Sequence, residues 1–240
     1  MFGLEFVSAG FLHLVALDTK PSVEQIECSP KKPLVVDVVS VQDDVRYDFS
    51  KKTVELNQIG KGAYSPYGED HLNVESRGLT VGKQSLSHNI DFYFEKYKDE
   101  GLVCLQIQKV KVTMDYAPTV YVSTKFQKGT PIFQKILEHE NEHVKITKRV
   151  LDQHANILEE RLKNELKDGF SAGPFFIDNM EPEQQELQDR VNRIIARVDS
   201  AMHKEAQRQH NLFDDAELDD SIEYNQGVAR KLEKILKIND

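Results

Sequence analysis

The stretch from Pro131 to Asp168 contains no glycine and no proline after its first residue, and its apolar side chains recur at helical spacing. Thr130 is a suitable N-cap residue, and a proline fits the first position of a helix. Gly169 then ends the pattern. An apolar stripe of this length predicts one long amphipathic helix, which must bury that stripe against the rest of the chain.

Residues 139–143 of this predicted helix read His-Glu-Asn-Glu-His, which is the H-E-x-x-H pattern. Histidines four residues apart lie one turn apart on one helix face, so both imidazoles can bind one zinc ion. His139 and His143 are therefore predicted metal ligands, and Glu140 is the predicted catalytic base that deprotonates a zinc-bound water. All three fall within roughly 60° of the apolar stripe, which favours a buried site over a solvated, charged helix face.

The chain changes character near residue 128. Before it, runs of β-branched and alternating apolar residues predict strands over residues 34–41, 53–59, 90–97, 102–114 and 120–124. After it, helical patterns cover residues 131–168, 183–212 and 221–238, with the acidic run DDAELDD before the last of them. The expected fold is α+β: a β-rich N-terminal half, then a long antiparallel helix pair that carries the motif, and a C-terminal helix.

Three regions follow from these patterns: an N-terminal segment at 1–20, a β-rich region at 21–128 and a helical region with the site at 129–240. A chain of 240 residues is large enough for one good core, so the last two are expected to form one integrated domain. Residues 1–17 are apolar but short for a membrane span, and they lack the basic start of a signal peptide. They fit either a degenerate secretion signal or a segment packed on the core, and no stable membrane span is expected.

Catalytic zinc usually has three protein ligands, so the motif needs a third residue from another element. The link between the two long helices is centred near residue 174, and a short link favours antiparallel neighbours. Positions that sum to about 348 are then level, which places Glu205 beside His143 on the inward stripe of its helix. Glu205 is the predicted third ligand, although it also fits an ordinary surface glutamate. His210 is the reserve, and His154 lies about 16 Å along the helix from His143, too far to share the ion.

Composition narrows the range of partners. A net charge of −9 argues against a nucleic-acid backbone or an anionic membrane as the main partner. The two cysteines, Cys28 and Cys104, belong to no C-x-x-C pair, so a cysteine zinc site is not expected. They fit either one disulfide across the N-terminal half or two buried free thiols.

The motif resembles that of the zincin metallopeptidases, with His139 and His143 in the place of the zinc ligands and Glu140 in the place of the base. The run VYVSTKFQKGTPIFQKILEHENEHVKITKRVL resembles a family of uncharacterised bacterial proteins that are grouped with zinc proteases. The resemblance implies Zn²⁺ as cofactor, a peptide or protein as substrate, and export to the periplasm or beyond, with the cytoplasm as the alternative. The metzincin continuation is absent, since Ile146 and Arg149 occupy its glycine and last histidine positions.

These features predict a zinc-dependent metallopeptidase that hydrolyses peptide bonds with a zinc-activated water. Residues 120–124 come just before the motif helix and are expected to form an edge strand that pairs with an extended peptide, with Tyr121 lining the groove. The alternative is a non-catalytic helical interaction protein with a structural or vestigial metal site. A metal hydrolase of other amide bonds would share the same site.

Overall fold

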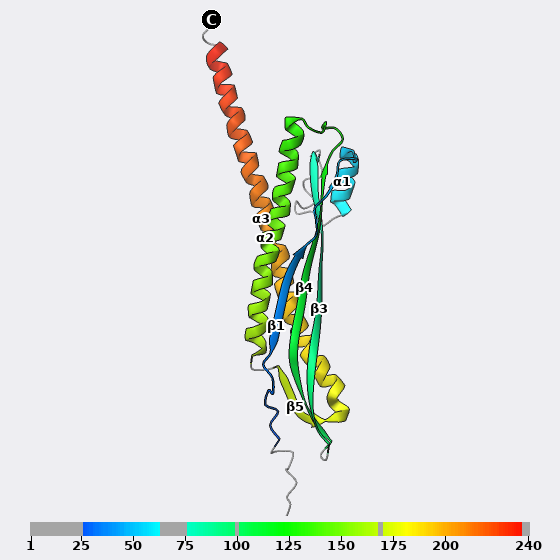
Figure 1. Ribbon diagram of the computed structural model, residues 1–240. Coiled ribbons are helices and arrows are strands. Elements are labelled where there is room, and N and C mark those ends of the chain that lie inside the picture. Colours follow the sequence, from blue (N-terminus) through cyan, green and yellow to red (C-terminus); the bar gives the residue numbers. More distant parts are fainter. Residues whose placement is uncertain (1–25, 63–75, 99–100, 168–169, 237–240) are drawn as a thin grey trace, which may run out of the picture.

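The structure is a computed structural model that describes residues 26–62, 76–98, 101–167 and 170–236. The predicted N-terminal segment, residues 1–20, lies outside these ranges. The described strands and helices, shown in Figure 1, are β1 (Val35–Gln42), β2 (Arg46–Asp48), α1 (Thr53–Gly62), β3 (Gly78–Tyr97), β4 (Leu102–Val122), α2 (Pro131–Leu166), β5 (Ser171–Phe176) and α3 (Met180–Leu236).

Strand β4 is the centre of the sheet, and each of the other four described strands pairs with it. β3 pairs antiparallel along its whole length, from Gly78 opposite Val122 to Tyr97 opposite Leu102. Because β3 occupies one edge of β4, the other strands must follow one another along the opposite edge. There β5 pairs antiparallel with the start of β4, β1 pairs parallel with its middle, and β2 pairs parallel with its end. The sheet is therefore long and narrow (Figure 1).

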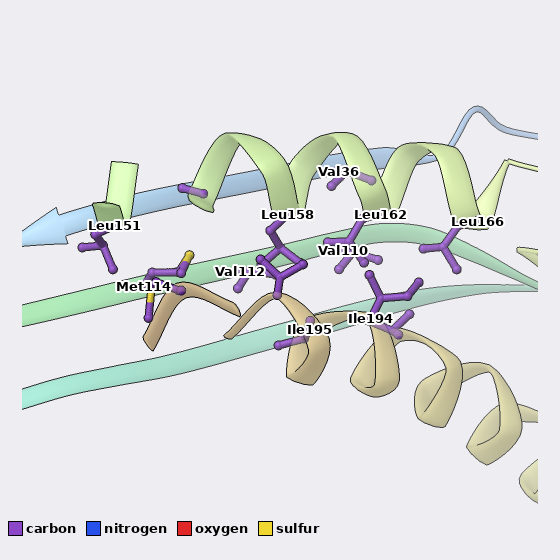
Figure 2. Close-up of a cluster of buried hydrophobic side chains, with 14 of the residues drawn as sticks. Val36, Val110, Val112, Met114, Leu151, Leu158, Leu162, Leu166, Ile194 and Ile195 are labelled. Atoms are coloured by element: carbon purple, nitrogen blue, oxygen red, sulfur yellow. The ribbon is translucent and has the colours of Figure 1, made fainter. Parts of the chain in front are cut away.

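One face of this sheet is covered by α2 and α3. Val110, Val112 and Met114 of β4 are almost fully buried, whereas Lys111 between them is exposed. Side chains alternate between the faces of a strand, so the buried set points toward the helices. There it meets leucines of α2 and isoleucines of α3 in one apolar cluster (Figure 2), which includes Leu151, Leu158, Leu162, Leu166, Ile194 and Ile195.

Helix α2 begins as the sequence predicts. The Thr130 hydroxyl accepts a hydrogen bond from the backbone N–H of Phe133 at 3.4 Å, and Pro131 is the first helical residue. Its buried residues recur at helical spacing from Phe133 to Leu166. The predicted helix is confirmed from Pro131 to Leu166, and Asp168 lies outside the described residues.

The predicted arrangement of the remaining helices is wrong, although the fold class is α+β. In place of a helix hairpin, the chain leaves α2, returns to the sheet as β5 and passes through a 3-10 helix (Ile177–Asn179) before α3 begins. The two helices predicted after the link are one helix of 57 residues. The acidic run DDAELDD lies within it, because it contains no glycine or proline that would end a helix.

Helices α2 and α3 also do not lie level with each other as predicted. The buried residues in the second half of their contact follow steps of four on α3, namely Val198, Met202, Ala206 and His210. Steps of four move around a helix by about 40° each time, so the contact face winds around α3. Contact along rows of this spacing is typical of helices that cross, and Figure 1 shows the two helices crossing.

Two further predictions for the β-rich region are wrong: the strand at 53–59, and the edge position of 120–124, of which residues 120–122 do form the end of β4. Residues 53–59 belong to α1, where the Glu55 carboxylate accepts a hydrogen bond from the Lys52 N–H at 2.8 Å, which is half of a capping box. Alternation over so few residues does not outweigh a helix start of this kind. Residues 120–124 do not form an edge strand, because Val120 and Tyr121 are paired with β2 on one side and β3 on the other. A peptide cannot pair with that part of the chain.

A disulfide joins Cys28 to Cys104, whose Cα atoms lie 5.4 Å apart. It ties the segment before β1 to the central strand. Buried Gln106 of β4 holds the same segment: its Oε1 accepts a hydrogen bond from the Lys31 N–H at 2.9 Å, and its Nε2 donates to the Lys32 carbonyl. Among the described residues, no helix combines the length and apolarity that crossing a bilayer requires.

We expect the double variant Cys28→Ser, Cys104→Ser to lose about 2–5 kcal/mol of its free energy of unfolding. The bridge spans a sequence separation of 76 residues, and its removal frees that loop in the unfolded chain. Urea denaturation measures the loss. Reductant should lower the stability of the unmodified protein to the same level and leave the variant unchanged; equal stability with and without reductant would contradict this account.

Candidate metal centre

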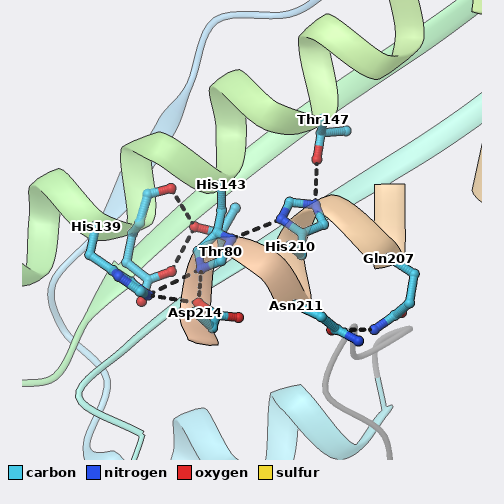
Figure 3. A network of polar contacts seen from close by, with 9 residues as sticks. Thr80, His139, His143, Thr147, Gln207, His210, Asn211 and Asp214 are labelled. Atoms are coloured by element: carbon cyan, nitrogen blue, oxygen red, sulfur yellow. Dashed lines mark hydrogen bonds and ion pairs between the residues drawn. The ribbon is translucent and has the colours of Figure 1, made fainter. Parts of the chain in front are cut away.

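Helices α2 and α3 bring three ligand atoms together where they cross (Figure 3). His139 and His143 come from α2, and Asp214 comes from α3. Nε2 of His139 lies 3.1 Å from Nε2 of His143, and Oδ1 of Asp214 lies 3.2 Å from the His143 nitrogen and 3.5 Å from the His139 nitrogen. The structure therefore contains a cluster of two imidazoles and one carboxylate that could hold a metal ion.

The separations within this triangle fit a tetrahedral ion. A metal ion with bonds of about 2.0–2.1 Å holds its ligand atoms about 3.3 Å apart. The three observed distances lie on both sides of that value. In the described part of the chain no further His, Cys, Asp or Glu joins the cluster, so these residues leave one tetrahedral position to a non-protein ligand.

Burial of the cluster supports the same conclusion. His143 is only 3% exposed, and the second carboxylate oxygen of Asp214, Oδ2, is buried without a hydrogen-bond partner in the described structure. A buried carboxylate oxygen without a partner is costly, and such groups in native proteins generally have a reason. A cation bound at the neighbouring Oδ1 would offset part of the cost of burying this carboxylate.

The other side of His143 contacts a second buried histidine. Nδ1 of His143 lies 2.8 Å from Nδ1 of His210, and Nε2 of His210 lies 3.0 Å from the Thr147 hydroxyl. Burial above all, together with the nearby His143 imidazole, lowers the pKa of His210 to about 4, against the raising effect of Asp214. His210 is therefore a neutral imidazole that contacts a ligand without supplying a ligand atom.

Glu140 lies beside the cluster on the side of the sheet. Its carboxylate Oε2 accepts a hydrogen bond from the Thr80 hydroxyl of β3 at 2.8 Å, and the backbone carbonyl of Glu140 lies 2.9 Å from the same hydroxyl. Burial raises the pKa of Glu140, whereas the His143 and His139 imidazoles and the Thr80 hydrogen bond lower it. A carboxyl group balanced in this way can both accept and release a proton.

The first residue of β3 makes room for this carboxyl group. A Cβ atom at Gly78 would lie 2.6 Å from Oε1 of Glu140 and 2.7 Å from Cγ2 of Ile136. Any larger side chain would displace α2 or Glu140 from the strand. Gly78 and Thr80 thus form a cradle in which the strand backbone approaches the carboxyl group closely.

Phe213 of α3 packs against both imidazoles of the motif. Its ring centroid lies 5.1 Å from that of His139 and 5.2 Å from that of His143. Phe213 also lines a cavity of about 240 Å³ between α2 and α3, and a larger cavity of about 710 Å³ lies between α2 and the ends of β1 and β2. Neither cavity is lined by the three ligand residues.

The predicted third ligand, Glu205, does not reach the cluster. Its two oxygens accept hydrogen bonds from Arg208 at 2.7 and 2.8 Å, and Gln209 donates to one of them at 2.8 Å. These bonds lower the pKa of Glu205 to about 2. The prediction fails because it assumes a short link and a straight inward stripe, whereas β5 lengthens the link and the contact face winds around α3. His143 therefore lies opposite His210.

Sequence reasoning misses Asp214 altogether, although a signal for it exists. Asp214 follows His210 by one helical turn, and the same steps of four lead back through Ala206 and Met202 to Val198. Extending the buried stripe of α3 in steps of four residues from Val198 would have predicted Asp214. His154, which the sequence places outside the site, donates a hydrogen bond from Nδ1 to the Val150 carbonyl at 2.9 Å.

Comparison with known proteins finds no relative, since no family model, no curated protein sequence and no solved structure matches this chain. The resemblance to zincin metallopeptidases therefore stays a prediction from the motif. The geometry of the cluster is the basis for any functional conclusion.

We expect Asp214→Asn to weaken the binding of Zn²⁺ by at least about 100-fold. Loss of an outer-shell partner already costs 10–100-fold, and Asp214 would supply a direct ligand atom. Glu205→Gln is a matched control on the same helix and should bind Zn²⁺ like the unmodified protein. Competition with a chromophoric chelator measures both affinities; a loss confined to Glu205→Gln would restore Glu205 as the ligand.

The stability of the metal-free protein should fall as the pH is lowered from about 6.5 to about 4. His210 stays neutral in the folded chain down to about pH 4, whereas in the unfolded chain it takes up a proton near pH 6.5. The unfolded state binds more protons in this interval, so acid favours it. Urea denaturation in the presence of a chelator measures how stability changes with pH. The slope should be shallower for His210→Gln and unchanged for His203→Gln, which replaces a partly exposed histidine.

Proposed function

We propose that this protein is a zinc-dependent hydrolase that cleaves peptide bonds. The observation that carries the proposal is the triangle of His139, His143 and Asp214 atoms, whose separations fit one tetrahedral ion, with the buried Glu140 beside it. Two imidazoles and one carboxylate with a free fourth position are the ligand pattern of catalytic rather than structural zinc. Mg²⁺ and Ca²⁺ prefer more ligands and only oxygen, so they fit this set poorly.

Zinc at this place would lower the pKa of a bound water to about 7 and polarise the scissile carbonyl. Glu140 is the base that takes the proton of the attacking water and passes it to the leaving amine. Its elevated pKa from burial supports the second half of this role, because a weakly acidic carboxyl group holds a proton long enough to deliver it. The Thr80 hydroxyl holds Oε2 of this carboxyl group in place, and Oε1 faces Gly78.

The position of β3 supports a peptide as the substrate. β3 starts at the cradle of Gly78 and Thr80, and among the described strands it pairs only with β4. Its outer edge can therefore offer backbone hydrogen bonds to an extended peptide next to Glu140. This edge replaces residues 120–124, which lie in the middle of the sheet.

The disulfide between Cys28 and Cys104 supports an exported location for this activity. Disulfides persist in the periplasm and outside the cell, whereas cytoplasmic reductants keep most thiols free. A peptidase in such a compartment would act on exported or extracellular proteins.

The alternative is a structural metal site in a non-catalytic protein. It is favoured by the packing of Phe213 on both imidazoles and by the absence of the three ligands from the walls of either cavity described above. The cobalt-substituted protein separates the two functions. Its visible spectrum should change when a hydroxamate binds an open fourth position, and it should stay the same if the site is structural.

We expect Glu140→Gln to lower peptide hydrolysis by about 100- to 10,000-fold while one zinc ion per chain is retained. Glu142→Gln is the matched control within the motif, because Glu142 is partly exposed and forms an ion pair with Lys145. Mass spectrometry of a peptide library measures hydrolysis, and elemental analysis measures zinc. Unmodified protein without stoichiometric zinc, or full activity in Glu140→Gln, would falsify the proposal.

A further inference from the structure

His210 is buried between α2 and α3 and belongs to the site without joining the triangle. Its Nδ1 faces Nδ1 of His143 at 2.8 Å, and its Nε2 faces the Thr147 hydroxyl at 3.0 Å (Figure 3). Both ring nitrogens of His210 thus have partners. His210 lies on the side of His143 that faces away from His139 and Asp214. His210, which the sequence offers as a reserve metal ligand, is therefore not a fourth ligand of the cluster.

The placement of hydrogen atoms gives His210 another role. An imidazole nitrogen binds a cation through its lone pair, so His143 must carry its hydrogen on Nδ1 if Nε2 binds the metal. That N–H needs an acceptor, and Nδ1 of His210 lies 2.8 Å from the nitrogen that carries it. His210 must then carry its own hydrogen on Nε2, from which it donates to Thr147.

Beyond Thr147 lies buried Tyr116, whose pKa is raised by burial and lowered by a hydrogen bond with the Thr147 side chain. The donors therefore point one way, from His143 to His210 and from His210 to Thr147, away from the metal. The opposite direction would place a hydrogen on Nε2 of His143, where it would block the ligand atom.

We propose that His210 is a positioning residue that fixes the metal-binding tautomer of His143, through a hydrogen-bond chain that continues to Thr147. This role rests on the proposed metal site but does not require hydrolysis. It also explains why a histidine is buried in the crossing of two helices, where an apolar residue would pack at lower cost.

The core holds both ends of this chain in place. Tyr116 belongs to β4, and its ring crosses Gly82 of β3, where a Cβ atom would come within 2.1 Å of ring carbon Cε2. Glycine at this position gives the ring the space in which its hydroxyl meets Thr147. At the other end, buried Met202 and Ala206 precede His210 on the same face of α3.

The test measures the zinc affinity of the full chain by competition with a chelator. His210→Leu removes the acceptor of the His143 N–H, and we expect it to weaken zinc binding about 10- to 100-fold. His210→Asn keeps a side-chain oxygen that can accept the same hydrogen bond, so it should recover part of the loss. His203→Leu is the matched control: it replaces a partly exposed histidine on the same helix, and the variant should bind zinc normally.

A second measurement reads the tautomers directly. In the zinc-loaded protein, two-bond ¹H–¹⁵N couplings should show the hydrogen of His143 on Nδ1 and that of His210 on Nε2. Thr147→Val leaves His210 in place but removes its acceptor, so it should weaken zinc binding less than His210→Leu. This variant and the couplings decide the question if circular dichroism shows that His210→Leu does not fold.

The outcomes separate this role from the proposed function. Normal zinc affinity in folded His210→Leu, or a hydrogen on Nε2 of zinc-loaded His143, overturns the role of His210 and leaves the hydrolase proposal intact. Zinc binding without peptide hydrolysis contradicts the hydrolase, while the affinities still decide the role of His210. An unmodified protein that binds no zinc overturns both.

Discussion

The apolar stripe of α2 is the constraint on which the rest of the structure depends, because one helix face serves both the core and the site. Its C-terminal part buries Leu158 and Leu162 against β4 and α3, and its N-terminal part directs Glu140 and His143 into the same interior. A helix keeps residues in fixed register along its length, so the packing of the leucines sets the position of the imidazoles. Packing of the core therefore holds the ionisable side chains of Glu140 and His143 at buried positions of an otherwise apolar stripe.

Local signals are sufficient to predict this helix and half of the site. The cap at Thr130, the proline after it and the periodicity up to Leu166 act within a few turns, so no tertiary information is needed to find α2. The spacing of His139 and His143 likewise fixes their common face before any partner is known. The same spacing predicts that Glu140 lies beside the two imidazoles. Only its contacts with Gly78 and Thr80 of β3 require the structure.

The rest of the fold depends on contacts between distant parts of the chain. β3 starts at Gly78, far before the region 90–97 in which alternation is clear, because its pairing with β4 rather than its own composition makes it a strand. The identity of the third ligand also depends on contacts between distant parts of the chain. Whether α3 presents Glu205 or Asp214 to α2 depends on the length of the link and on the crossing of the helices, and residues 167–179 alone do not reveal either. The residue opposite His143 shifts by five, from Glu205 to His210, which is more than one helical turn and brings Asp214 rather than Glu205 into the cluster.

The site joins three elements that are remote in sequence, since β3 supports the base, α2 carries the imidazoles and α3 carries the carboxylate. A cation held by His143 and Asp214 would therefore also hold the two helices together, and its binding free energy would add to the stability of their crossing. Burial of the Asp214 carboxylate, one of whose oxygens has no hydrogen-bond partner in the described structure, gives the metal-free protein a cost that a cation at the other oxygen would offset in part. A catalytic ion and a structural ion would consequently occupy the same site in this protein. The same three bonds would serve both purposes. Only the accessibility of the fourth coordination position to water distinguishes a hydrolase from a structural metal site that joins the two helices.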